Sequence, residues 1–361
     1  MNSQSDKIYQ LLAAFKGEEN NPLLAPRGVC FVNDTLVVSD TGQNRIFIWQ
    51  NFQFDEYQQA DVVLGQATTT NTERNAGDNL SASTLQYPSG IWTDGNKLIA
   101  ADAWNHRVLI WHNLPTQHGQ AADVVIGQKD FISNLPNVEG LSKPCSAQSL
   151  YWPYGVYSNG TALWIADTGN RRVLYFDKIP TTNFCAADNL IGQDTFFDRD
   201  FDNKNAVWPY SVKINNDGSM LIADTQFYRT LYWKQWEHAL TQKAELIFGQ
   251  PDLDSSGQNQ TQLKPSAHTL NWCYDACFFK KGIAIADTGN SRIVIHNSIP
   301  LKNNMPAQGL IGQQSFEING ESSLSFTTNI KNEMYWPFAV NAFEDTIIIA
   351  DTGNHQILFY K

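Results

Sequence analysis

The chain has 361 residues, and its 25 Lys and Arg against 36 Asp and Glu give a formal net charge of −11. This acidic balance disfavours nucleic acid as a partner, because an acidic surface repels a phosphate backbone. The apolar run from Leu11 to Phe15 is too short for a signal peptide, and no later run is long enough to span a membrane. The five Cys do not suggest a disulfide framework, so we expect a cytoplasmic protein.

A short polar hinge between two apolar runs recurs six times along the chain. In the third copy, residues 163–176 read LWIADTGNRRVLYF, in which β-branched and aromatic flanks suit paired strands and Asp-Thr-Gly-Asn suits a tight turn. Copies at spacings of 62, 65, 57, 63 and 64 residues indicate one supersecondary unit repeated along the chain. The hinges begin at Asp40, Asp102, Asp167, Asp224, Asp287 and Asp351.

Each unit is expected to contain four strands. In the third unit these are residues 153–157, 162–166, 172–176 and 188–192. The fourth segment ends in Gly-Gln and is present in five copies, whereas there are six hinges. One unit therefore lacks a fourth strand of its own.

The last unit stops after a third strand, Gln356 to Tyr360, while a spare apolar segment, Gln10 to Gly17, precedes the first unit. We therefore predict that the N-terminal strand completes the last sheet, because a closed circle removes exposed strand edges. The predicted fold is all-β: a six-bladed β-propeller of four-stranded antiparallel blades, with residues 1–361 as one domain. The blades are expected at residues 26–66, 88–128, 153–193, 209–250, 273–313, and 337–361 together with 8–17.

Long irregular segments separate the units, each following a Gly-Gln and preceding the next first strand. Connections of this length in a compact domain are usually functional or flexible. In an up-and-down blade they leave on the same face as the Asp hinges, which we call the top face. They are residues 67–86, 129–151, 194–207, 251–271 and 314–335.

The hinge resembles the motif of the NHL-repeat family: Asp-Thr-Gly-Asn-x-Arg before an apolar strand, preceded by Pro-x-Gly-Val. Asn105-His106 and Asn354-His355 keep the Asn-His pair of that motif, and the repeated Gly-Gln is similar to a group of bacterial NHL-like proteins. The resemblance covers nearly the whole chain and implies a six-bladed propeller. It leaves function open, because the family includes protein- and RNA-binding modules, sensor domains and a metal-dependent lyase.

The hinge Asp residues have a structural and a functional interpretation. A ring of carboxylates is able to coordinate a cation. In five units, however, an Arg follows five positions later, which favours an ion pair and a capped turn. Gln356 stands at this position in the sixth unit, so its Asp has no evident partner. The Arg series is Arg45, Arg107, Arg172, Arg229 and Arg292.

Aromatic residues gather before and within the predicted first strands, which converge on the propeller axis. One interpretation is that they pack the wedge-shaped blade interfaces. The other is an aromatic-walled pocket for an apolar, cationic or stacking ligand. Tyr154, Tyr210, Tyr274 and Phe338 lie two positions after members of this set. Trp104, Phe227 and Tyr228 replace Gly-Asn-type hinge residues in units two and four. The candidate ligand-binding residues are Tyr87, Trp104, Trp152, Trp208, Phe227, Tyr228, Trp272 and Trp336.

The fifth unit departs most from the repeat, since it reads WCYDAC over residues 272–277. Alternate residues of a strand share a face, so Cys273, Asp275 and Cys277 are expected to point the same way. With His268 they form a candidate site for a divalent metal ion. The alternative is that the Cys residues are small apolar fillers. Asp275 replaces a Gly, and a buried carboxylate is costly unless it is paired or liganded.

These patterns support three functional hypotheses. The first is a binding scaffold that engages a small molecule or a protein partner at the top face and the mouth of the central channel. The alternative is a metal-dependent lyase or hydrolase with its site at the channel mouth near blade five. A third is a purely structural assembly hub. No Ser-His-Asp order or phosphate loop is found in the sequence, so it identifies no catalytic residue.

Overall fold

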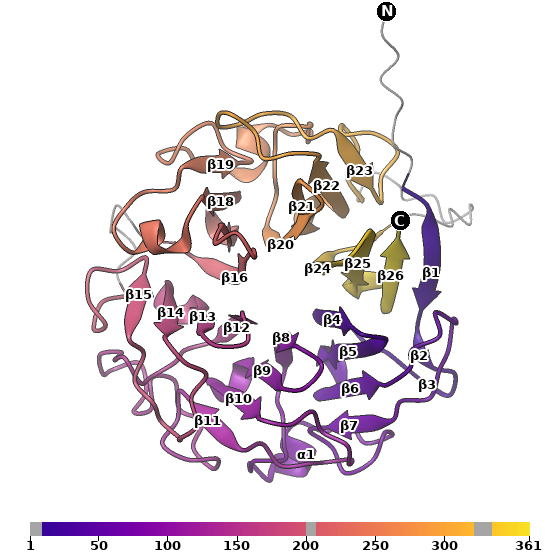
Figure 1. The fold of residues 1–361 in the computed structure, drawn as a ribbon, viewed down its shortest axis with the longest axis vertical. Coiled ribbons are helices and arrows are strands. Elements are labelled where there is room, and N and C mark those ends of the chain that lie inside the picture. Colours follow the sequence, from indigo (N-terminus) through magenta and orange to yellow (C-terminus); the bar gives the residue numbers. More distant parts are fainter. Residues whose placement is uncertain (1–8, 200–206, 321–333) are drawn as a thin grey trace, which may run out of the picture.

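The computed structural model describes residues 9–199, 207–320 and 334–361, and it confirms the predicted six-bladed β-propeller. Six four-stranded antiparallel sheets surround a central axis (Figure 1). The first strand of each blade is innermost and contacts the first strands of both neighbouring blades. In the described residues, no helix is long and apolar enough to cross a membrane.

The strands of the first three blades follow the chain outward from the axis. They are β4 (Gly28–Val32), β5 (Thr35–Asp40), β6 (Arg45–Trp49) and β7 (Val62–Leu64); β8 (Pro88–Thr93), β9 (Leu98–Asp102), β10 (Arg107–Trp111) and β11 (Val124–Ile126); and β12 (Pro153–Ser158), β13 (Leu163–Asp167), β14 (Arg172–Phe176) and β15 (Asn189–Ile191).

The other three blades repeat this order, except that the last takes its outer strand from the N-terminal region. They are β16 (Pro209–Ile214), β17 (Met220–Asp224), β18 (Arg229–Trp233) and β19 (Leu246–Phe248); β20 (Cys273–Phe279), β21 (Gly282–Asp287), β22 (Arg292–His296) and β23 (Gly309–Ile311); and β24 (Pro337–Phe343), β25 (Thr346–Asp351), β26 (Gln356–Tyr360) and β1 (Leu11–Phe15).

Short helical turns and one small sheet complete the described elements. A 3-10 turn occupies the hinge of every blade. The elements are η1 (Thr41–Gln43), η2 (Ala103–Asn105), η3 (Thr168–Asn170), η4 (Thr225–Phe227), η7 (Thr288–Asn290) and η9 (Thr352–Asn354) at the hinges, with η5 (Trp236–Leu240), η6 (Gln258–Thr261), α1 (Asn75–Asp78) and the pair β2 (Gly17–Glu18) and β3 (Asn21–Pro22).

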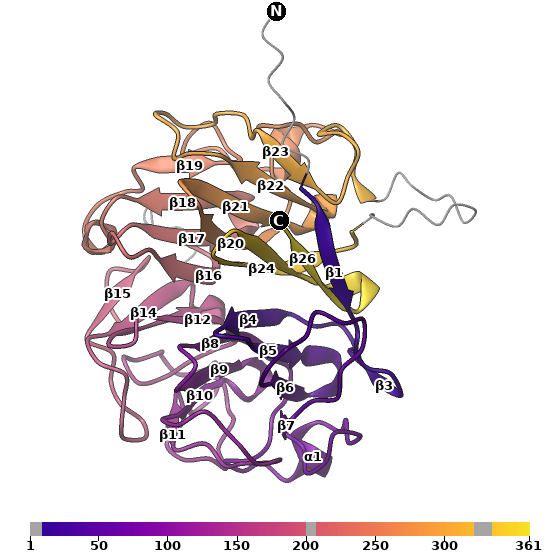
Figure 2. The ribbon, with the colours of Figure 1, turned by 45° about the vertical axis from the view of Figure 1, so that its right-hand side comes forward.

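The N-terminal strand closes the circle as predicted. β1 runs antiparallel to β26, with Phe15 opposite Ile357, and Figure 2 shows it along the outer side of β26. Phe15 is fully buried and packs edge-on against Trp49 and Phe52 of blade one. The strand therefore covers the edge of blade six and also packs against blade one.

The hydrophobic core lies between the blades, so both faces of an inner hairpin are buried. In β5, Val37 faces the cluster shared with blade two, while its neighbour Val38 faces the cluster shared with blade six. Both residues are fully buried. This two-sided burial explains why the strands read as continuous apolar runs rather than as alternating ones.

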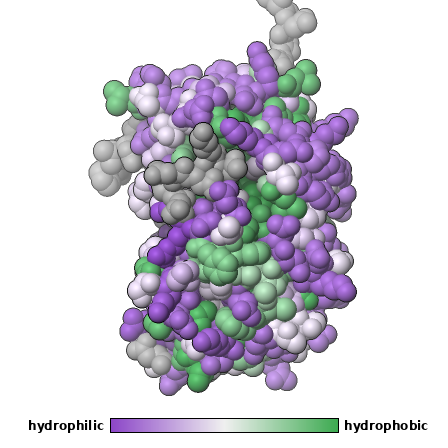
Figure 3. All heavy atoms as spheres, turned by 90° about the vertical axis from the view of Figure 1, so that its left-hand side faces the viewer, coloured by the Kyte–Doolittle hydropathy of each residue, from purple (hydrophilic) through white to green (hydrophobic). Residues whose placement is uncertain are grey.

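The outer side of blades three and four, seen in Figure 3, is mostly hydrophilic with smaller apolar patches. On this side a groove lies between β15 and η5, with Leu190, Val207 and Leu240 among its lining residues. The groove is far from the central channel in the circular arrangement of Figure 1, since β15 is the outermost strand of blade three.

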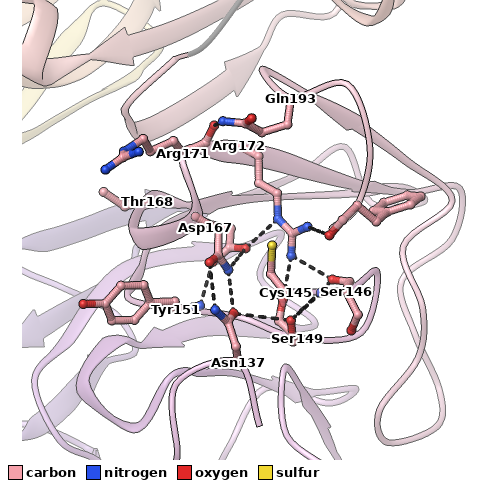
Figure 4. Close-up of polar contacts among 12 residues, drawn as sticks. Asn137, Cys145, Ser146, Ser149, Tyr151, Asp167, Thr168, Arg171, Arg172 and Gln193 are labelled. Carbon is pink, nitrogen blue, oxygen red and sulfur yellow. Dashed lines mark hydrogen bonds and ion pairs between the residues drawn. The ribbon is translucent and has the colours of Figure 1, made fainter. Parts of the chain in front are cut away.

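Each hinge is held by a buried polar network that is best seen in blade three (Figure 4). Arg172 donates from Nε to Asp167 Oδ2 at 2.8 Å, and both side chains are fully buried. The guanidinium also donates to the carbonyl oxygens of Phe196 at 2.6 Å, Ser146 at 2.8 Å and Ser149 at 3.0 Å. One ion pair therefore anchors the long connections on both sides of the blade.

The other blades repeat the ion pair with one exception. In blades one, two, four and five the Arg Nε to Asp Oδ2 distance is 2.6–2.8 Å. In blade six Gln356 donates its amide to Asp351 Oδ2 at 2.8 Å, and burial raises the pKa of Asp351 to about 6. The structure thus supports the structural interpretation of the hinge Asp residues.

A first prediction concerns closure. Deleting residues 1–17 removes β1 and leaves the edge of β26 unpaired, so we expect the melting temperature to fall by well over about 4 °C. Differential scanning calorimetry measures this. Leu12→Ser serves as the control, because Leu12 is half exposed, and its effect is expected to stay within about 0.5 kcal/mol. An unchanged melting curve for the deletion would contradict the closure.

A second prediction concerns the hinge ion pair. Arg172→Met leaves the Asp167 carboxylate buried without its cation, so we expect the free energy of unfolding to fall by about 3–5 kcal/mol. Gln356→Met is the matched comparison in blade six. It removes only an amide donor to a carboxyl group, for which about 1–2 kcal/mol is expected. Urea unfolding measures both, and equal losses would show that the charge of Arg172 contributes nothing.

Candidate functional site

Six side chains, one from each blade, form a closed ring around the top of the central channel. The rings of Tyr154 and Tyr210 stack at 4.9 Å between centroids, Tyr210 meets Tyr274 edge-on at 4.6 Å, and Tyr274 lies 4.3 Å from Phe338. Tyr87 lies 6.4 Å from Tyr154. The circuit is completed by a cation, which the sequence analysis did not single out.

That cation is Arg27, directly before β4. Its Cζ lies 3.8 Å from the ring centre of Phe338 and 5.0 Å from that of Tyr87. A guanidinium over an aromatic face is attracted by the ring quadrupole. The only sequence signal was positional, since Arg27 follows Pro26 as Tyr154 follows Pro153. We call Arg27, Tyr87, Tyr154, Tyr210, Tyr274 and Phe338 the channel ring.

Four Trp side chains at the top ends of the blades remain 41–47% exposed: Trp104 in the hinge of blade two, and Trp152, Trp272 and Trp336 directly before the first strands of blades three, five and six. We call them the rim. Two of them contact the channel ring directly. Trp104 stacks on Tyr87 at 4.6 Å, and Trp272 lies edge-on to Tyr274 at 6.5 Å. All of the aromatic side chains predicted from the sequence except Trp208, Phe227 and Tyr228 therefore belong either to the packed channel ring or to the exposed rim.

The hinge network places the rim. Asp167 Oδ1 accepts the backbone N–H of Tyr151 at 2.7 Å, and the chain then turns through a left-handed residue, Trp152 (φ 50°), into β12. Trp272 and Trp336 have the same conformation, with φ of 48° and 51°. A bulky residue in this region is strained, and such strain persists where the surroundings enforce it.

Blade four enters its first strand differently. Asp224 Oδ1 accepts the N–H of Trp208 itself at 2.6 Å, so Trp208 takes the place that Tyr151 has in blade three. Trp208 is half-buried, and Arg171 Cζ lies 4.7 Å from the centre of its ring. Phe227 and Tyr228 belong to the hinge of blade four, where Arg229 Cζ lies 4.6 Å from the ring centre of Phe227.

The hinge of the preceding blade also supports the rim. The residue that ends each hinge turn is left-handed, and in blade two it is His106, whose Nδ1 accepts the backbone N–H of Trp152 at 3.2 Å. Asn44 makes the equivalent bond to Tyr87 at 3.0 Å through Oδ1. Burial lowers the pKa of His106 to about 4, so the ring is neutral and able to accept at pH 7.

Below the channel ring lies a small cavity, with about 40 Å³ accessible to the centres of water-sized molecules. Its charged lining residues are Arg27, Lys213 and Asp275. Asp275 Oδ1 lies 4.0 Å from Lys213 Nζ and accepts the N–H of Ala276 at 2.9 Å. Its Oδ2 accepts the N–H of Val340 at 3.1 Å. Burial raises the pKa of Asp275, while Lys213 opposes that shift.

The four candidate metal ligands do not come together. A bulge between Cys273 and Asp275 places Cys273 opposite Asp287 but Cys277 opposite Ala284. Cross-strand partners share a face, so the prediction that the two Cys point the same way is wrong, because the extra residue inverts the alternation. Cys273 packs towards blade four and Cys277 towards blade six.

His268 is exposed, and its Nδ1 lies 2.8 Å from the carbonyl oxygen of Asn304. Across residues 9–199, 207–320 and 334–361, no three His, Cys, Asp or Glu side chains gather as metal ligands would. Of the four residues, only Asp275 lines the channel cavity. The cost expected of a carboxylate at this position is offset by its backbone donors and by Lys213.

The fold and the channel define the class of this protein as a six-bladed β-propeller. No protein-family profile and no curated protein sequence matches the chain, so the NHL resemblance gains no support from them. Similar solved structures include a streptogramin B lyase, with 9% identity over 98% of this chain and 97% of that chain and a TM-score of 0.48.

Others are hydrazine synthase of Kuenenia stuttgartiensis (9% identity, 93% of this chain and 95% of that chain, TM-score 0.49) and the WD40 repeats of RRP9 (10% identity, 95% and 78%, TM-score 0.45). At such identities and TM-scores these similarities carry no argument about function.

A third prediction concerns acid stability. The pKa of His106 is about 4 in the folded protein, compared with an ordinary value of 6.5. The neutral ring therefore contributes to the free energy of unfolding in full above pH 6.5, and this contribution is lost as the pH falls towards 4, because the unfolded chain takes up the proton first. We expect protonation of His106 to lower the free energy of unfolding by on the order of 3 kcal/mol over this pH range. The variant His106→Asn keeps a side-chain acceptor for the backbone N–H of Trp152, like Asn44 in blade one, but has no imidazole that titrates.

Urea unfolding of both proteins at several pH values between 7 and 4 checks this prediction. The stability difference between wild type and His106→Asn is expected to shift in favour of the variant as the pH falls. Parallel pH profiles for the two proteins would contradict the assigned role of His106. Comparing the two profiles cancels the contribution of His296, whose pKa burial also lowers to about 4.

Proposed function

We propose that this protein is a non-catalytic binding propeller that holds a small molecule at the top mouth of its central channel. The observation that carries the proposal is the rim of four half-exposed Trp side chains, two of which, Trp104 and Trp272, pack on the channel ring. Large exposed aromatic side chains beside the mouth of a cavity are typical of ligand sites.

The backbone of the rim supports the same conclusion. Trp152, Trp272 and Trp336 are bulky residues in left-handed conformations, which cost about 1–2 kcal/mol each relative to ordinary backbone. Their side chains nevertheless remain 41–45% exposed, so burial of these rings within the folded chain offsets only part of that cost. Stacking of a bound apolar or aromatic group on the rim would bury the remaining surface.

The alternative of a metal-dependent lyase or hydrolase near blade five receives no comparable support. It needs ligands that converge, whereas Cys273 and Cys277 lie on opposite faces of the blade. The other candidate ligand of the rim is a protein partner at the top face, and the experiment below distinguishes it from a small molecule.

A fourth prediction tests the rim. Saturation-transfer NMR with indole, phenol and benzoate is expected to detect binding to the wild-type protein. In Trp104→Ala/Trp272→Ala the affinity is expected to fall about tenfold, because each aromatic contact contributes about 0.5–1.5 kcal/mol. Leu301→Ala is the control: Leu301 is fully exposed on the connection between β22 and β23, away from the top face.

Binding that survives the double substitution unchanged would contradict the proposed site. If none of the three compounds binds, the small-molecule proposal fails. If a macromolecule then protected the rim Trp side chains against chemical modification, a protein partner would be favoured. Circular dichroism of both variants checks that the fold is retained.

A further inference from the structure

The channel ring contains one charged residue without a charged partner. The buried Arg residues of five hinges all pair with an Asp. Arg27 differs from them. In the described ranges of the chain, no carboxylate lies within ion-pairing distance of its guanidinium, which lies over the faces of Phe338 and Tyr87.

The charge balance of the cavity is positive although the protein as a whole is acidic. Arg27 and Lys213 line it together with a single carboxylate, Asp275. Asp275 is already engaged by two backbone N–H groups and lies 4.0 Å from Lys213. The guanidinium of Arg27 is therefore left as the uncompensated charge of the site. Its planar fork of donors matches an oxyanion in geometry.

Neutral donors lie around the same cavity. The hydroxyl of Ser89 is buried, its residue being only 4% exposed, and it has no hydrogen-bond partner in the described structure. Tyr210 and Tyr274 also line the cavity. Tyr hydroxyls are protonated at neutral pH and able to donate, and burial raises the pKa of both, that of Tyr274 to about 12. A buried hydroxyl without a partner is costly, which favours a ligand that accepts from it.

The size of the cavity limits what enters it. About 40 Å³ for the centres of water-sized molecules holds a group of a few atoms, because one water needs roughly 10–15 Å³ on this measure. An aromatic ring does not fit there. A ligand that uses both the cavity and the rim therefore has a small polar end and a larger apolar body.

Resting on the proposed function, we infer that the channel mouth binds a small organic anion. Its oxyanion group sits on Arg27 and Ser89 at the channel ring, and its apolar or aromatic body lies against the rim residues Trp104 and Trp272. Carboxylates, sulfates and phosphates share the required chemistry of a compact, negatively charged acceptor. Arg27 supplies the charge selectivity of the site, and the rim supplies contact area.

The test compares matched ligands by isothermal titration calorimetry on the full-length protein. Benzoate and benzamide have nearly the same shape, but only benzoate is an anion. We expect benzoate to bind at least about tenfold more tightly than benzamide, as is usual for a hydrogen bond to a charged group. Phenyl sulfate and phenyl phosphate, measured in the same way, distinguish the kinds of oxyanion.

Variants locate the charge that is responsible. Arg27→Gln is expected to reduce benzoate affinity at least about tenfold while leaving benzamide affinity within about twofold. Arg27→Lys keeps the charge but loses the planar fork, so an intermediate loss is expected. Lys302→Gln removes a charge from an exposed position and is expected to change neither affinity.

Equal affinities of wild-type protein for benzoate and benzamide would overturn the anion inference and leave the rim as a site for neutral aromatic compounds. An anion preference that persists unchanged in Arg27→Gln would also overturn it. Failure of every charged and neutral compound to bind would reject both this inference and the proposed function. Because the benzoate and benzamide comparison uses wild-type protein, it remains decisive even if Arg27→Gln does not fold.

Discussion

The buried ion pair between hinge Asp and strand Arg is the interaction on which the rest of this propeller depends. Asp167 accepts from Arg172 with one oxygen and from the backbone of Tyr151 with the other. Arg172 in turn binds carbonyl oxygens on both long connections of the blade. A single buried pair therefore fixes the ends of two connections. It also positions the backbone of Trp152, the residue after Tyr151, at the start of the innermost strand.

This arrangement separates what holds the fold from what is available for binding. The repeated residues, such as Asp167 and Arg172, are fully buried and engaged with one another. Several residues that differ between blades lie on or directly before the innermost strands, where six first strands meet at the axis. Arg27, Lys213 and Asp275 are such departures, and all three line the channel cavity. In a repeat protein the departures from the repeat are thus the better guide to function.

Much of the fold was predictable because its signals are local. The hinge motif, the count of apolar segments and the spare N-terminal strand each occupy a short stretch of sequence, and β1 pairs with β26 as they predicted. The candidate site was predictable in part. Of the predicted residues, Tyr87, Trp104 and Trp272 contact members of the channel ring. Trp208 differs from Trp152, because its own backbone N–H binds the hinge Asp and blade four enters its first strand without the left-handed turn.

The sequence by itself determined the number of blades, the order of their strands and the Arg partner of five of the six hinge Asp residues, because strand patterns and turn motifs depend on residues that are close together in the chain. Only the tertiary structure decided which side chains share the channel. Arg27 and Phe338 are far apart in sequence and meet because the circle closes between blades one and six. A one-residue bulge likewise turned Cys273 away from Cys277, since register between strands, and not spacing along one strand, decides the face that a side chain occupies.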